Sequence, residues 1–178
     1  QADSPPLVIE VGSAVEGLAI SASDRLFSRS ADHTVREWSP HDGRDLDRWE
    51  VVLQTGRNVI DADAEGARLA CSAGNEIVII DTGSGVIQRF EAAQGWVEDV
   101  RFILDPDTRG HIAAISADYA LRVWDVQHNR RVLEATAHTE RPQVIIPISG
   151  SAGLWSMDRG GLFRCWDFGS PKRDTIVF

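Results

Sequence analysis

A short apolar motif closed by tryptophan recurs along this chain at nearly constant spacing. Its clearest copy is Ala-Leu-Arg-Val-Trp-Asp at 120–125, and further copies contain Trp38, Trp166 and, with isoleucine in place of the tryptophan, Ile80. From one anchor to the next the spacing is 42, 44 and 42 residues. A repeat of this length indicates four similar modules, each stacked on its neighbours in the sequence.

Short β-branched runs fill each repeat and are separated by Gly, Asp, Asn and Ser clusters, whereas no window shows a sustained helical stripe. About 40–45 residues is the length of one four-stranded propeller blade. We therefore predict an all-β fold, a single partial β-propeller over 1–178 with about four blades of antiparallel strands. The predicted blades are approximately 12–53, 54–92, 93–136 and 137–178. Residues 7–11 are predicted to be an outer strand of a neighbouring blade.

The stretch 26–39, Leu-Phe-Ser-Arg-Ser-Ala-Asp-His-Thr-Val-Arg-Glu-Trp-Ser, resembles the strand-turn-strand core of WD-repeat β-propeller proteins. Segments 112–125 and 154–167 follow the same template, and Ala137-His138 resembles the Gly-His pair that opens a repeat in that family. The resemblance covers essentially the whole chain. It implies these structural blade anchors: Trp38, Ile80, Trp124, Trp166, Asp32, Asp118 and His138.

Blades of that family are often locked by a buried network of histidine, serine or threonine, aspartate and tryptophan. No repeat of this sequence has a complete set by position. The first lacks the histidine, the second lacks the tryptophan, and the fourth has Gly160 where the aspartate is expected. We therefore expect apolar packing to stabilise these blades more than the polar network does.

Arginine occupies the same place in three repeats, at Arg36, Arg122 and Arg164. Such periodicity favours a shared packing role, with each side-chain stem lying against the next blade, over a clamp for a ligand.

Four blades form an open arc, because rings of this family usually close with about seven blades within a range of 4–8. An open arc leaves an apolar sheet face bare at each end, which requires a covering partner. We expect completion by further sequence, by a second copy or by another subunit. The chain begins with Gln1 and has no signal-like start, so we expect it to be part of a longer protein.

The net charge of −9 disfavours nucleic acid and anionic lipid as partners. The longest uncharged stretch, 142–157, contains proline and glycine, so we predict no membrane span. Cys71 and Cys165 lie in different repeats, each inside a predicted strand, where buried thiols are simpler than a disulfide. These features together favour a reducing, cytoplasmic location.

The sequence matches no catalytic or metal-binding pattern. Residues 105–110 superficially resemble a calcium loop, but Arg109 and Ser116 stand where acidic ligands are required. No histidine has the spacing of a zinc site; the five are His33, His41, His111, His128 and His138. A nucleophile elbow and a phosphate-binding loop are also missing from the sequence. We predict no enzyme activity, no metal and no cofactor.

Two tryptophans lie outside the repeat position. Trp49 falls in an outer strand and could cover a sheet edge. Trp96 stands at the entry to the third repeat, which in the family lies at the rim of the face where peptides dock; burial between blades is the alternative. The predicted partner-binding patch consists of Trp96, Tyr119, Arg57 and Arg141.

The function that the resemblance implies is a non-catalytic platform or scaffold for a protein or peptide partner, within a larger multidomain protein. The alternative is a self-assembling homo-oligomer in which two four-blade arcs close into one ring.

Overall fold

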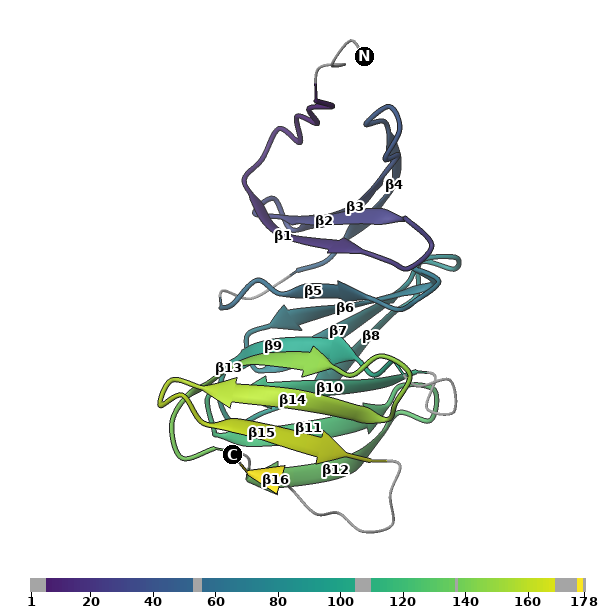
Figure 1. Ribbon diagram of the computed structural model, residues 1–178. Coiled ribbons are helices and arrows are strands. Elements are labelled where there is room, and N and C mark those ends of the chain that lie inside the picture. The colour runs from purple at the N-terminus through teal and green to yellow at the C-terminus, as the bar shows by residue number, and fades with distance from the viewer. Residues whose placement is uncertain (1–5, 53–55, 105–109, 137, 169–175, 178) are drawn as a thin grey trace, which may run out of the picture.

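The computed structural model describes residues 6–52, 56–104, 110–136, 138–168 and, by backbone alone, 176–177 (Figure 1). Within these residues all regular structure is β-strand, arranged in four antiparallel four-stranded sheets. The prediction of an all-β fold with four blades is therefore confirmed.

Each blade is a meander in which consecutive strands pair. Blade 1 contains β1 (Val15–Ile20), β2 (Leu26–Ser30), β3 (Thr34–Trp38) and β4 (Asp45–Glu50). Blade 2 contains β5 (Ile60–Ala62), β6 (Arg68–Ala73), β7 (Glu76–Asp81) and β8 (Ile87–Glu91). Blade 3 contains β9 (Val97–Phe102), β10 (His111–Ser116), β11 (Ala120–Asp125) and β12 (Arg130–Thr136). Blade 4 contains β13 (Pro142–Pro147), β14 (Gly153–Asp158), β15 (Phe163–Asp167) and β16 (Ile176–Val177).

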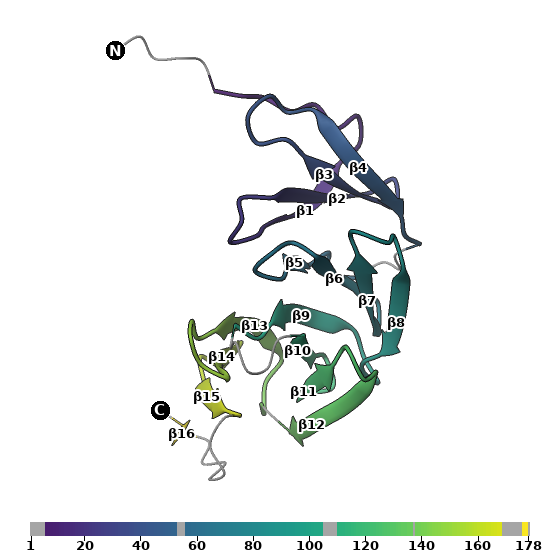
Figure 2. The same ribbon diagram turned by 90° about the vertical axis from the view of Figure 1, so that its right-hand side faces the viewer.

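The blades follow one another around an open arc (Figure 2). The first strands β1, β5, β9 and β13 lie on its concave side, and the outer strands β4, β8 and β12 lie on its convex side. Blades 1 and 4 form the two ends, so each has only one neighbouring blade among the described residues.

Apolar side chains fill each space between neighbouring blades. Phe27 and Leu69 are buried between blades 1 and 2, Ile77 and Ile112 between blades 2 and 3, and Leu154 meets blade 3 in the last interface. Fully burying one such side chain stabilises a fold by about 1.5–3 kcal/mol. Each of the three interfaces therefore has its own apolar core cluster.

The predicted outer strand at 7–11 is wrong. These residues form no strand, and β1 is the first strand of the described chain. The segment instead passes the turn between β3 and β4, where a Cβ atom at Gly43 would lie 3.0 Å from Ile9 Cγ1. The Val11 carbonyl accepts a hydrogen bond from Arg36 Nη1 at 3.1 Å. The run is apolar and rich in β-branched residues, but no strand edge of the described chain pairs with it, and backbone pairing is what makes a strand.

Other expectations fall partly outside the described residues. One is the calcium-like loop at 105–110, except for Gly110. Ala137 of the Ala-His pair also lies outside them.

Blade 4 contains a complete buried polar network, so the expectation that no repeat has one is wrong. His138 Nδ1 donates to Asp158 Oδ2 at 3.0 Å, and Nε2 accepts from the Ser156 hydroxyl at 2.7 Å. Trp166 Nε1 donates to the same Ser156 Oγ at 2.9 Å. This chain of bonds requires a neutral imidazole. Burial lowers the pKa of His138 in the same sense, although the bond to Asp158 opposes it.

Position counting missed Asp158 because the turn of blade 4 is longer. Asp158 precedes Trp166 by eight residues, whereas Asp32 and Asp118 each precede their tryptophan by six. Counting six residues back from Trp166 gives Gly160, which lies inside the turn between β14 and β15.

Arginine takes the place of the histidine in blades 1 and 3. Arg36 Nη2 lies 2.7 Å from Asp32 Oδ2, and Arg122 Nη1 lies 2.9 Å from Asp118 Oδ2. Both arginines stand two residues before the blade tryptophan, on the strand that follows the aspartate turn. The periodic arginines of these blades therefore hold their own turns.

Candidate partner-binding face

The loops that enter the first strand of each blade lie on the same face of the arc as the turns between the second and third strands. Backbone bonds join each of these loops to the turn of the preceding blade. They run from Val97 N–H to the Gly74 carbonyl (2.8 Å) and from His138 N–H to the Tyr119 carbonyl (3.2 Å). Within blade 3, Ala117 N–H donates to the Trp96 carbonyl (2.8 Å). This face is therefore held rigidly from blade to blade.

Glu98 lies on β9 of blade 3 and is almost completely buried. Arg57, at the entry to blade 2, places Nε 3.0 Å from Glu98 Oε2. Arg141, at the entry to blade 4, donates from Nε to Oε1 at 2.7 Å and places Nη2 2.5 Å from the same oxygen. One buried carboxylate thus joins three blades, and burial of such a charge requires these partners.

The two arginines remain accessible while they compensate Glu98. Their side chains are 49% and 43% exposed, for Arg57 and Arg141 respectively. Two positive charges on one negative charge leave a net positive charge at the surface. Sequence reasoning selected both arginines but missed Glu98, because no motif marks it and only the stacking of blades brings the three together.

Two exposed aromatic side chains belong to the loops and turns of the same face. Trp96 precedes Glu98 by two residues and is 55% exposed, which argues against the alternative of burial between blades. Tyr119 is 42% exposed in the turn between β10 and β11, where its φ of 67° is unusual for a residue other than glycine. Trp49, in contrast, is buried in the core between blades 1 and 2. The structure therefore places all four residues of the predicted patch on one face of the arc.

Two aspartates, the partly buried Asp61 and the buried Asp99, connect the innermost strands of neighbouring blades. Asp61 on β5 accepts a hydrogen bond from the Phe102 amide at 2.8 Å, and Asp99 on β9 accepts one from the Ile145 amide at 2.8 Å. Arg101 lies between them, with Nη1 3.6 Å from Asp61 Oδ1 and Nε 3.2 Å from Asp99 Oδ1. Burial raises the pKa of both carboxyl groups, against the lowering effect of these contacts. The bonds keep neighbouring blades in register along the concave side.

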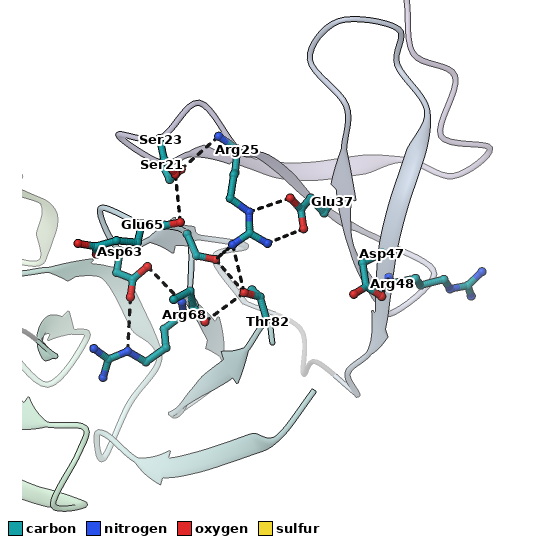
Figure 3. Close-up of polar contacts among 12 residues, drawn as sticks. Ser21, Ser23, Arg25, Glu37, Asp47, Arg48, Asp63, Glu65, Arg68 and Thr82 are labelled. Carbon is teal, nitrogen blue, oxygen red and sulfur yellow. Dashed lines mark hydrogen bonds and ion pairs between the residues drawn. The ribbon is translucent and has the colours of Figure 1, made fainter. Parts of the chain in front are cut away.

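A second polar network joins blades 1 and 2 on the opposite face of the arc (Figure 3). Arg25 forms a two-pronged pair with Glu37, at 2.8 Å from Nε and 2.7 Å from Nη2. Its Nη1 donates to the Gly66 carbonyl at 2.6 Å, and Thr82 Oγ1 donates to the same oxygen at 2.9 Å. Because the guanidinium is directed toward groups of the two blades, this network acts as an interblade clamp.

The Ser156, His138 and Asp158 side chains are connected in the order of a hydrolase triad, but they lie in the core. Each is at most 3% exposed, and the Ser156 oxygen already accepts the Trp166 N–H bond. No substrate can reach this serine in the folded blade. The arrangement therefore stabilises the blade and does not supply a nucleophile.

No further reactive or metal-binding group stands out in the described part of the chain. Burial raises the pKa of the Cys71 thiol to about 12, which keeps it protonated. In the described ranges no three His, Cys, Asp or Glu side chains gather closely enough to hold a metal ion. The described residues also include no helix with the length and apolar character needed to cross a membrane.

Comparison with known proteins shows a WD-repeat relative and WD-repeat structures. No family model matches the chain. A curated relative is the ribosome biogenesis protein WDR12 homolog of Oryza sativa subsp. japonica, 22% identical over 123 residues that cover 65% of this chain and 27% of the relative. Among solved structures, the RRP9 WD40 repeats superpose with a TM-score of 0.79 at 20% identity, covering 97% of this chain and 53% of that one. The structure of U3-55K superposes with a TM-score of 0.79 at 19% identity, covering 97% and 54%.

These similarities confirm the resemblance drawn from the repeats: the fold is that of a WD-repeat β-propeller, with four repeats. The chain spans about half the length of the solved propellers and 27% of the rice relative that it matches.

Proposed function

We propose that this four-blade WD-repeat arc is a non-catalytic platform that binds a protein or peptide partner on the patch formed by Trp96, Tyr119, Arg57 and Arg141. The observation that carries the proposal is the exposure of Trp96 on an edge whose backbone is bonded from blade to blade. A rigid loop edge binds a partner with little ordering cost, and exposed tryptophan and arginine are typical anchors of interfaces.

The similarity to longer WD-repeat proteins supports a place for these blades within a larger, multidomain chain. The rice relative is named for ribosome biogenesis, and a scaffold role in that process is a setting that fits this platform. The net charge of −9 favours a protein over a nucleic acid as the partner. Two free cysteines favour the reducing cytoplasm.

Affinity capture with the wild-type chain and two alanine variants tests the platform. Trp96→Ala removes the proposed anchor, whereas Phe163→Ala removes an aromatic of similar exposure, 47%, from blade 4. The captured partner is then purified and its affinity is measured by calorimetry. We expect Trp96→Ala to weaken binding by about 30-fold, the effect of a hot spot of roughly 2 kcal/mol, and Phe163→Ala to leave it nearly unchanged.

Thermal unfolding of both variants provides the control. Unchanged stability of Trp96→Ala together with lost binding supports the patch. Full binding by Trp96→Ala, or a stability loss of the size caused by a core truncation, would argue against it.

Self-assembly is a second candidate function, favoured by the bare faces of the two end blades. Blade 1 exposes Leu18 and Ile20 at 65% and 64%, and blade 4 exposes Ile146 and Phe163 at 57% and 47%. Two arcs that each correspond to about half of a solved propeller could bury these faces against one another in one ring.

Light scattering behind a sizing column, over a range of concentrations, decides between these candidates. A mass of twice 19.6 kDa that persists on dilution supports ring closure by two copies. A mass of 19.6 kDa at every concentration would rule this assembly out and leave the platform as the function.

A further inference from the structure

We infer that the partner is an acidic peptide, which places a carboxylate between Arg57 and Arg141 while a neighbouring apolar side chain packs on Trp96. This inference rests on the proposed platform function and adds the chemistry of its ligand.

The first argument is that the two guanidinium groups keep donors free. Arg57 contacts Glu98 through Nε as an ion pair, and none of the hydrogen bonds found among the described residues involves its two Nη groups. Arg141 contacts Glu98 through Nε and Nη2, which leaves Nη1 available. A guanidinium presents its five N–H groups in a planar fork that matches a carboxylate, so two such forks facing solvent favour this group as ligand.

The second argument is that two acidic groups near this site, Asp99 and Asp118, are already engaged with other partners. Asp99 is buried and accepts bonds from Arg101 and the Ile145 amide. Asp118 is paired with Arg122 and accepts the Gln94 amide.

An acidic ligand would meet repulsion from most of this protein, whose net charge is −9. A locally positive site on such a surface therefore determines where the ligand binds and in which orientation, because like charges elsewhere disfavour other positions.

The third argument concerns spacing. Trp96 immediately precedes β9 and Glu98 is the second residue of that strand, so about 7 Å of extended chain separates them. An extended peptide spans this distance with residues i and i+2, whose side chains point to the same side. The expected ligand therefore carries an Asp or Glu two residues from a large apolar residue.

Selection from a random dodecapeptide phage library on the immobilised wild-type chain tests this chemistry directly. We expect enrichment of Asp or Glu two positions from Leu, Phe or Trp, and depletion of Lys and Arg. An enriched peptide is then synthesised together with its Glu→Gln or Asp→Asn counterpart, and fluorescence anisotropy compares them at low and high salt. The neutral counterpart is expected to bind about tenfold more weakly, and the difference should shrink at high salt.

Two variants locate the binding. Removing either arginine would leave Glu98 buried with less compensation, so Arg57→Lys/Arg141→Lys is the variant of choice because it keeps both charges and loses the planar forks. We expect it to bind the acidic peptide about tenfold more weakly with an unchanged circular dichroism spectrum. Trp96→Ala should weaken the same peptide by a similar factor.

The possible failures are distinguishable. Enriched peptides without acidic residues, which still depend on Trp96, would overturn the acidic ligand and leave the platform intact. Peptides that bind Trp96→Ala and the lysine variant as well as wild type would place binding elsewhere and overturn both. A single-stranded RNA dodecamer that binds more tightly than the selected peptide, and is weakened in the lysine variant, would replace the carboxylate by a phosphate backbone.

Discussion

Replacement of Ser156 by alanine measures how much the buried network stabilises blade 4. The Ser156 hydroxyl serves two partners, because it accepts the Trp166 indole N–H and donates to His138 Nε2. Alanine leaves both groups buried without a partner, and each such loss costs about 1–3 kcal/mol. We expect the free energy of unfolding to fall by about 3 kcal/mol, toward the lower part of the summed range because the imidazole can relax.

Blade 1 supplies the matched control. Ser28 is as buried as Ser156, and its hydroxyl accepts the Trp38 N–H bond at 2.8 Å, but no histidine shares it. Ser28→Ala therefore orphans one group and should cost roughly half as much, about 1.5 kcal/mol. Urea titrations at neutral pH, monitored by circular dichroism and tryptophan fluorescence, would measure both free-energy losses. A Ser156→Ala cost no greater than that of Ser28→Ala would refute the reasoning that the histidine network adds stability.

Three further predictions concern buried polar groups. Burial lowers the pKa of His138 below its ordinary value of 6.5, so the unfolded chain takes up this proton at higher pH than the folded chain. Urea midpoints should therefore fall as the pH is lowered from about 7.5 to about 5.5, and they should fall less steeply in His138→Gln. Equal slopes in the two proteins would contradict this. Arg29 is 1% exposed and donates to the Ser72 carbonyl and to Asn58. Arg29→Ala should therefore lower the free energy of unfolding by about 2–4 kcal/mol, and Arg29→Met, which refills the space, should lower it clearly less. Equal losses of both variants in urea titrations would show that packing contributes little. Cys71, with its pKa raised to about 12, should resist a thiol reagent in the native state while the half-buried Cys165 reacts first; labelling at equal rates, read by mass spectrometry, would count against the burial.

Much of the fold could be predicted because its signals are local. Alternation of side chains and turn residues repeat in every unit, and the tryptophan anchors give the phase. The same local evidence was insufficient at 7–11, since an apolar, β-branched run becomes a strand only if an edge is available to pair with it. It was also insufficient at Asp158, where two additional turn residues displaced the aspartate from the position that counting assigned to it.

The candidate site was predictable only in part. The sequence predicted a partner-binding patch of Trp96, Tyr119, Arg57 and Arg141, and the structure places these residues on one face of the arc. What they surround could not be read from the sequence, because Glu98 has no distinguishing neighbours along the chain.

The sequence by itself determined the number of blades, the strand order within each blade and the tryptophan-centred turns, because these follow from interactions within about forty residues. Tertiary structure alone decided which charges meet. Arg141 and Glu98 are 43 residues apart in the chain, yet they lie in contact because successive blades stack with their entry loops on the same face of the arc. Stacking removes Glu98 from water, and this desolvation makes its pairing with two arginines from flanking blades necessary.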